Sequence, residues 1–368
     1  MLIGIDASRT SKKEKTGVEW YAYHLLRAMR KLPSAHSFRL YTRDPLPFSM
    51  PPAWEERVVA WPFPLLWTQG GLSMEMLRHA PDILFVPSSA LPFILPRRSV
   101  TTIHDVGFLQ ERSYRSAREL SYLDWSTRFA VNHATKVIAV SEFTKRELVR
   151  LYDAPPEKIV VVHEAHAHAV PFTEEAVQEI RRTHQLTRPY LLFVSRIDSR
   201  KNVGTLIEAF RLLKKRKVFD GDLALVGPLG FDGADIIRQG GTGAYGECIR
   251  HLGWISEMEK NALLQAAVAF VFPSLYEGFG MVILEAQSRG VPVICSNTTS
   301  LPEVAGRGAY GIDPNDPESV AAGVSAVLQD SELRHTLVMR GRENAKNFSW
   351  DRAARETLEV FEQAANTH

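Results

Sequence analysis

Short apolar runs alternate with amphipathic stretches along both halves of the chain. The first half has strand-like runs at residues 2–5, 38–41, 83–86, 100–103, 136–140 and 159–162. The second half has them at residues 190–194, 223–226, 251–252, 268–272 and 292–294. Helix-like stretches lie between them, among them 19–31, 141–151, 203–217 and 257–265. Strands that alternate with helices indicate parallel sheets covered on both faces.

A polar, irregular stretch at about 165–187 separates the two series, although residues 174–183 could form a short helix. We therefore predict an α/β protein of two doubly wound, Rossmann-like domains that face each other across a cleft. Residues 1–168 form the predicted N-terminal domain and residues 185–349 the C-terminal one. A last amphipathic helix is predicted from residue 350 onward.

Composition is that of a globular protein, with 368 residues, 45% hydrophobic and 23% charged. No apolar run approaches the roughly 20 residues that span a bilayer. The N-terminus shows no basic segment of a signal peptide. Cys248 and Cys295 form no metal-binding pattern, so the expected setting is the reducing cytoplasm.

Charge is distributed unevenly along the chain. Residues 1–168 hold 22 Lys and Arg against 17 Asp and Glu, whereas the remainder holds 22 against 25. A basic first domain suits an anionic partner or the inner face of a membrane. Chance scatter of charge is the alternative.

Two glutamates eight residues apart are the most informative motif. Glu277 follows the apolar run 266–272, and the chain then turns through glycines into an apolar helix that carries Glu285. Such a strand, glycine turn and helix place a ligand site at a helix N-terminus. One carboxylate can face a reacting centre while the other holds a more distant part of the same ligand. Alternatively, Glu277 only starts a helix and Glu285 is solvated, but an idle carboxylate on a buried helix is costly.

A pair of cations brackets the first loop of the second domain. The strand 190–194 ends at Ser195, and Arg196 and Lys201 lie in the loop that follows, before a helix near Asn202. Ligands bind at the carboxyl ends of strands in open α/β sheets. A guanidinium and an ammonium there suit a diphosphate. A solvated basic loop is the alternative.

Together these motifs resemble the retaining nucleotide-sugar glycosyltransferases of family 4, which have the GT-B fold, over nearly the whole chain. Glu277 and Glu285 match that family's E-x7-E motif, and Arg196 and Lys201 match its diphosphate-binding pair. Residues 225–228 resemble its strand-plus-glycine segment, and residues 251–256 the segment that meets the nucleotide base. Residues 348–350 resemble the start of the last helix, 350–368, which crosses back to the N-terminal domain in this fold.

The resemblance implies a role for each motif. Glu285 would bind the ribose hydroxyls, Glu277 would lie near the donor sugar, and Arg196 and Lys201 would neutralise the leaving diphosphate. Further implied donor-binding residues are Gly17, Ser195, Gly227, Trp254, Ile255, Gly278, Phe279, Gly280, Met281 and Val282. No metal is implied, and the chain has no obvious Asp-x-Asp cluster.

The N-terminal domain should supply the acceptor side. It lacks a G-x-G-x-x-G motif, which argues against a dinucleotide-dependent dehydrogenase. Gly17 resembles the family's glycine loop over the donor phosphate, although relatives often carry two or more glycines there. His104 resembles a histidine that reaches the donor sugar; alternatively, its neighbour Asp105 holds it in a loop. Glu142 could face the cleft, but helix capping by Ser141 explains it nearly as well.

A histidine-rich segment and a basic helix end suggest other chemistry. His166 and His168 would point the same way from a strand and could contribute to a zinc site. The segment replaces a proline-asparagine-glycine turn of relatives, and a role at the cleft rim or hinge is preferred. The basic run 214–217 suits a helix C-terminus, so nucleic-acid binding is not expected.

The expected function is transfer of a sugar, with retention, from a nucleotide donor to a glycan or lipid-linked acceptor. The segment 102–105 looks like that of bacterial mannosyltransferases of surface-polysaccharide synthesis, which favours GDP-mannose; a UDP-hexose is the alternative donor. A nucleotide-sugar epimerase and a non-catalytic sugar-binding protein are the alternatives from other classes.

Overall fold

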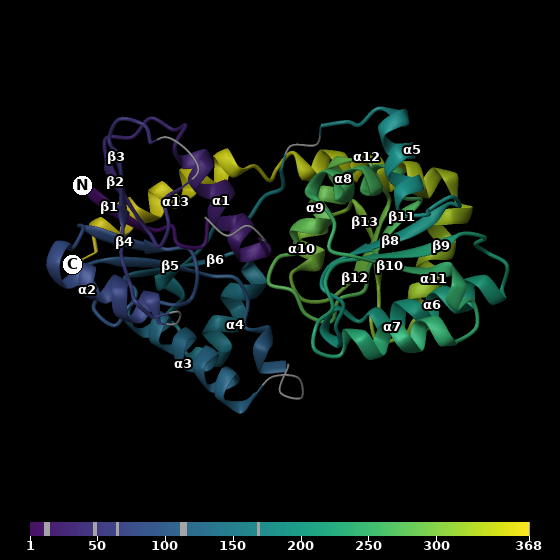
Figure 1. Cartoon of the computed structure of the whole chain (residues 1–368), viewed down its shortest axis with the longest axis horizontal. Helices are drawn as coiled ribbons and strands as arrows, with labels where there is room; N and C mark the ends of the chain where they lie inside the picture. The colour runs from purple at the N-terminus through teal and green to yellow at the C-terminus, as the bar shows by residue number, and fades with distance from the viewer. Residues whose placement is uncertain (11–14, 47–49, 64–65, 111–115, 168–169, 368) are drawn as a thin grey trace. The chain divides into compact units, whose positions relative to one another are not determined.

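The computed structural model describes residues 1–10, 15–46, 50–63, 66–110, 116–167 and 170–367. The chain divides into two compact units, Met1–Ala165 with Ser349–His368 and His166–Phe348. Each unit is a parallel β-sheet with helices on its two faces (Figure 1). The two Rossmann-like domains of the predicted fold are thereby confirmed.

In the described part of the first unit, seven parallel strands form a sheet in the order β3-β2-β1-β4-β5-β6-β7. The strands are β1 (Leu2–Asp6), β2 (Ser37–Thr42), β3 (Trp54–Val58), β4 (Ile83–Val86), β5 (Ser99–Ile103), β6 (Lys136–Ala139) and β7 (Ile159–Val161). Its first helices are α1 (Gly17–Met29), α2 (Ser73–His79), α3 (Ala117–His133) and α4 (Glu142–Tyr152). Short helical turns span Trp67–Leu72, Gly107–Gln110 and Pro156–Lys158.

The last helix, α13 (Trp350–Ala365), belongs to this first unit, as the sequence predicts. Its amphipathic sequence buries one face against α1 and the middle strands. The Phe361 ring lies 5.1 Å from that of Phe85 on β4, and the Trp350 ring lies 5.4 Å from that of His24 on α1. Burial of these aromatic rings holds the end of the chain on the first sheet.

In the second unit, described strands form a six-stranded parallel sheet in the order β10-β9-β8-β11-β12-β13. They are β8 (Tyr190–Val194), β9 (Asp222–Val226), β10 (Ile249–Gly253), β11 (Ala269–Phe272), β12 (Val293–Ser296) and β13 (Ala309–Ile312). The helices are α5 (Glu174–Thr183), α6 (Val203–Lys215), α7 (Gly233–Thr242), α8 (Glu257–Ala266), α9 (Met281–Ser288), α10 (Leu301–Ala305), α11 (Pro317–Gln329) and α12 (Ser331–Ala345). Short turns span Ser199–Lys201 and Gly246–Cys248.

Two edge strands are absent from the sequence prediction. β3 and β13 each lie at the end of a sheet, and most of their residues are partly or fully exposed. An edge strand pairs on one side only and does not need the continuous apolar run that marks a central parallel strand.

The second unit begins at His166, earlier than the predicted boundary at 185. The reason is that α5 packs against α8, within this unit. Phe172 and Gln265 exchange two hydrogen bonds just before α5, of 2.9 and 3.0 Å between main chain and amide side chain. The short helix that the sequence allowed at residues 174–183 is therefore present, and its packing makes the preceding stretch part of the second unit.

Candidate functional site

The loop after β8 and the loop after β11 are joined by hydrogen bonds at successive residues. The carbonyl oxygen of Arg200 accepts from the main-chain N–H of Leu275 at 2.9 Å and from Ser274 Oγ at 3.3 Å. In the opposite direction, Arg200 Nη1 donates to the carbonyl of Tyr276 at 3.0 Å. β8 and β11 are neighbours in the sheet, so their carboxyl ends bring the basic loop and the first glutamate together.

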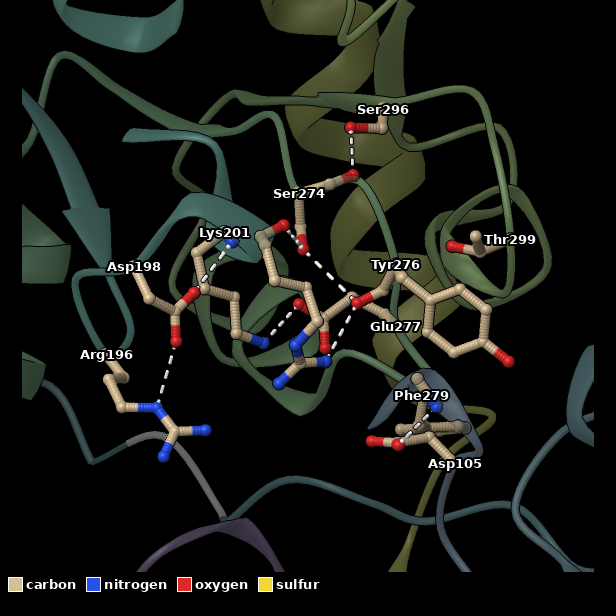
Figure 2. Close-up of polar contacts among 12 residues, drawn as sticks. Asp105, Arg196, Asp198, Lys201, Ser274, Tyr276, Glu277, Phe279, Ser296 and Thr299 are labelled. Carbon is tan, nitrogen blue, oxygen red and sulfur yellow. Dashed lines mark hydrogen bonds and ion pairs between the residues drawn. The ribbon is translucent and has the colours of Figure 1, made fainter. Parts of the chain in front are cut away.

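Lys201 and Glu277 form an ion pair where these loops meet (Figure 2). Each side chain is only 10% exposed. Burial lowers the pKa of the Lys201 ammonium below its ordinary value; the Glu277 carboxylate opposes this, and the positive charge of Arg200 adds to it. The structure therefore holds a buried cation with an adjacent carboxylate at the edge of the sheet.

Arg196 lies at the same edge but is more exposed. Its Nε donates to Asp198 Oδ2 at 3.0 Å, and Asp198 Oδ1 accepts from the main-chain N–H of Lys201 at 2.9 Å. The terminal nitrogens of the guanidinium point away from Asp198 (Figure 2). Asp198 thus orients the guanidinium and shapes the loop that carries Lys201.

Asn202 lies in the candidate site, but the sequence motifs predict no role for its side chain. Its backbone has a φ of +60°, a region that asparagine tolerates better than most residues. The buried amide Nδ2 donates to the carbonyls of Pro273 and Pro314, at 3.0 and 2.6 Å. Asn202 therefore joins three loops at the carboxyl ends of strands, and only the tertiary structure reveals this.

The turn that carries Glu277 is buried, and the side chain of Ser300 stabilises its main chain. Ser300 Oγ lies 2.9 Å from the carbonyl oxygens of both Glu277 and Phe279. Gly280, with a φ of +102°, is the N-cap of α9, where Met281 and Val282 form the partly buried first turn. The strand, glycine turn and helix inferred from the sequence are therefore present, and Ser300 supports them without a sequence signal.

Glu285 lies on α9 and is not a solvated side chain. It is 18% exposed, and its Oε2 lies 2.9 Å from Lys260 Nζ on α8. The alternative reading, in which Glu285 only faces solvent, is therefore wrong. Lys260 was not recognised in the sequence, because nothing in a single helix indicates a partner on another one.

Gly227 and Ser195 are placed by close backbone packing between β8 and β9. Gly227 has a φ of +135°, and a Cβ atom there would lie 2.0 Å from the Ser195 carbonyl oxygen. Its own N–H donates to the Gly253 carbonyl at 2.9 Å, at the end of β10. Trp254, 51% exposed, and the partly buried Ile255 follow directly. The predicted residues of the second unit therefore gather at neighbouring strand ends.

His104 follows β5 in the first unit. Its Nδ1 lies 2.8 Å from Glu164 Oε1 and its Nε2 lies 3.1 Å from the Pro87 carbonyl oxygen. The neighbouring Asp105 instead accepts from the main-chain N–H of Gly107 at 2.9 Å, so the alternative that Asp105 holds the ring is wrong. The buried Glu164 was missed because it lies 60 residues from His104.

Gly17 is the exposed first residue of α1, and Thr16 is the N-cap. Glu19 completes a capping box by accepting from the main-chain N–H of Thr16 at 3.1 Å. Residues 11–14 of the predicted glycine loop lie outside the described residues. At α4, Ser141 Oγ accepts from the N–H of Thr144 at 3.0 Å, which confirms the capping interpretation of Ser141.

The zinc alternative rests partly on His168, which lies outside the described residues. His166 Nε2 lies 3.2 Å from the carbonyl oxygen of Ala345. Within the described ranges, no group of three or more His, Cys, Asp or Glu is arranged to hold a metal ion.

Nor does any helix in the described part of the chain combine the length and apolar character needed to cross a membrane. Both cysteines are free and buried, and burial raises the pKa of Cys295 to about 12.

Two family patterns cover most of the chain. The pattern of "Glycosyl transferases group 1" matches residues 176–344, and that of "Glycosyltransferase Family 4" matches residues 15–165. These matches coincide with the two compact units.

Individual relatives agree with these patterns. The O-antigen chain mannosyltransferase B of Escherichia coli is 34% identical over 288 residues, covering 77% of this chain and 75% of that protein. The serotype-specific mannosyltransferase WbdA of Escherichia coli is 24% identical over 80% of this chain, which spans 38% of that protein. The solved structure of sucrose-phosphate synthase from Thermosynechococcus elongatus has the same fold, with a TM-score of 0.74, 20% identity and 98% coverage of both chains.

Three observations lead to one assignment. They are the 34% sequence identity to a mannosyltransferase, the two family patterns and the parallel sheet in each unit. The chain belongs to the group 1 glycosyltransferases of the GT-B fold, and it is an enzyme that uses a nucleotide-sugar donor.

Proposed function

We propose that this enzyme transfers mannose from GDP-mannose, with retention of configuration, to a hydroxyl group of a glycan or lipid-linked acceptor. The observation that carries the proposal is the buried Lys201–Glu277 pair at the carboxyl ends of β8 and β11. Mannose as the donor sugar is supported by the names of two relatives, both mannosyltransferases.

Lys201 and Arg196 are the proposed diphosphate ligands. Burial disfavours the charged form of the Lys201 ammonium, so a second anion nearby would stabilise that charge. The guanidinium of Arg196 can donate hydrogen bonds to two phosphate oxygens. As the glycosidic bond to the diphosphate breaks, negative charge grows on the leaving group. Two preorganised cations stabilise that charge without solvent reorganisation, which is the role a metal ion has in other enzymes. We therefore propose metal-independent transfer.

Glu277 is proposed to act at the donor sugar, with Gly278, Phe279 and Gly280 supplying main-chain contacts. Its carboxylate is already paired with Lys201, which makes it a weak nucleophile. This favours departure and attack on the same face of the sugar, with the leaving phosphate helping to deprotonate the acceptor. A covalent glycosyl–glutamate intermediate is not required.

The remaining residues are proposed to complete the donor site. Glu285 would accept from the ribose hydroxyls, and Trp254 with Ile255 would meet the base. Met281 and Val282, at the start of α9, would contact the diphosphate side of the donor. Ser195 and Gly227 would line the site through their backbones. In the first unit, Gly17 and His104 are the proposed contacts to the phosphate and the sugar.

A nucleotide screen tests the proposed donor. Thermal unfolding is measured with GDP, UDP, ADP and their sugars, since a ligand that binds only the folded state raises the Tm. We expect GDP and GDP-mannose to raise the Tm, by about 2–4 °C per kcal/mol of binding free energy if a domain of 150–250 residues unfolds as one unit. A response to UDP compounds alone would replace the donor but keep the site. No response to any nucleotide would contradict the proposed site.

We also propose that the first unit contacts a membrane surface, where a lipid-linked acceptor would reside. The first unit, residues 1–165 with 349–368, carries 24 Lys and Arg against 21 Asp and Glu, an excess of three basic residues. Exposed aromatic side chains, Phe93, Tyr122 and Trp125, add amphipathic surface. We expect the protein to sediment with anionic vesicles, but not with neutral vesicles, at low salt. Equal recovery in the supernatant with both kinds of vesicle would contradict this proposal.

A further inference from the structure

A lysine on α8 bridges two carboxylates beside the proposed ribose site. Lys260 Nζ lies 2.9 Å from Glu285 Oε2 on α9 and 2.8 Å from Glu257 Oε2, one turn earlier on α8. The Lys260 side chain is only 13% exposed. The ammonium is therefore committed to these two acceptors in a largely buried position.

The charge of Lys260 is maintained by its partners. Burial acts to lower the pKa of the ammonium, but the Glu285 and Glu257 carboxylates together raise it above its ordinary value. Arg289, one turn after Glu285 on α9, donates from Nη1 to the Glu285 main-chain carbonyl at 3.2 Å. Glu285 is thus bound by a cation at its carboxylate and by another at its backbone.

The position of Lys260 connects two parts of the proposed nucleotide site. α8 begins directly after Trp254 and Ile255, with Ser256 as its N-cap. Glu285 lies on α9, the helix that follows the Glu277 turn. The Lys260–Glu285 bond therefore links the helix after the base segment to the helix that carries the ribose carboxylate.

A glutamate side chain has three rotatable bonds, and holding it in one rotamer costs entropy when a ligand must do so. Lys260 fixes Oε2 before any ligand arrives, and this orients Oε1 as well. A preoriented carboxylate can accept hydrogen bonds from two adjacent hydroxyl groups without this cost.

We propose that Lys260 is a positioning residue that orients Glu285 toward the ribose hydroxyls and thereby sets the preference for ribonucleotide over deoxyribonucleotide donors. The inference rests on the ribose-binding role proposed for Glu285. Lys260 would affect the choice of nucleotide through the Glu285 side chain, without contacting the nucleotide itself.

The test compares binding of GDP and 2′,3′-dideoxy-GDP by calorimetry. The proteins are the wild type, Lys260→Met, Glu285→Gln and the double variant. We expect the wild type to prefer GDP by at least about tenfold, since hydrogen bonds to a charged group are strong. Lys260→Met should lose most of this preference, and Glu285→Gln should lose all of it. In the Glu285→Gln background, Lys260→Met should have no further effect on GDP affinity.

Further variants separate positioning from loss of structure. Lys260→Arg keeps the charge and should restore most of the preference. Lys260→Gln keeps a polar side chain of similar length and serves as the uncharged variant if Lys260→Met does not fold. Lys346→Met is the matched control, because Lys346 is 71% exposed and pairs with an exposed glutamate on α12. The control should leave the preference unchanged.

Three results would overturn the inference, and they are distinguishable. If the wild type binds GDP and 2′,3′-dideoxy-GDP equally well, the ribose-binding role of Glu285 itself is wrong. If Lys260→Met keeps the full preference for GDP, the positioning role of Lys260 is wrong, but the role of Glu285 is not affected. Weaker GDP binding by Lys260→Met in the Glu285→Gln background would show that Lys260 contacts the nucleotide directly.

Discussion

Glu277→Gln is expected to abolish sugar transfer while GDP still binds. The amide keeps the shape of the side chain but removes the charge that Lys201 faces. Loss of a preorganised charge at a reacting centre lowers kcat by about a hundredfold or more. GDP affinity should stay within about threefold of the wild type, because the diphosphate can replace the lost carboxylate as the counter-charge of Lys201. Transfer and binding measured on one preparation test this.

The same variant should be less stable without ligand. Removing one partner of a buried ion pair leaves an uncompensated charge, at a cost of about 3 kcal/mol. Because the two proteins should bind GDP with similar affinity, GDP should stabilise Glu277→Gln about as much as the wild type, and the deficit in stability should persist with ligand. Glu343→Gln is the control, since Glu343 is 72% exposed in its pair with Lys346. Full transfer activity in Glu277→Gln would show that the catalytic assignment is wrong.

Lys201→Met is expected to weaken both donor binding and transfer. It removes a proposed diphosphate ligand and leaves Glu277 buried without its cation, so that the site would repel an anion. We expect GDP affinity to fall by about tenfold or more, since bonds between charged groups are the strong ones. Lys201→Arg should recover part of the binding. Unchanged GDP affinity in Lys201→Met would exclude Lys201 from the diphosphate site.

Proton uptake provides a second measurement on Lys201. In the free protein its pKa lies below the ordinary 10.5, chiefly because of burial, and a bound diphosphate would raise it. Between these two values GDP binding must take up a proton, and affinity must decline as the pH rises through the free-protein pKa. Calorimetry at several pH values below 10.5, in buffers of different ionisation enthalpy, should detect the uptake. The uptake should be absent in Lys201→Met.

Much of the fold could be predicted because its signals are local. Central strands of a parallel sheet are buried on both faces and appear as apolar runs, and amphipathic stretches between them appear as helices. The glycine turn before α9 and the basic loop after β8 were likewise recognisable from neighbouring residues. The edge strands β3 and β13 were missed because their residues lack that burial.

The sequence by itself determined the two Rossmann-like domains, the returning C-terminal helix and the motif residues Glu277, Glu285, Arg196 and Lys201. Only the tertiary structure decided what these side chains touch. Lys201 meets Glu277 across 76 residues, His104 meets Glu164 across 60, and Glu285 meets Lys260 on another helix. Such partners depend on strand order and helix packing, which bring distant segments together and leave no periodic signal in either segment.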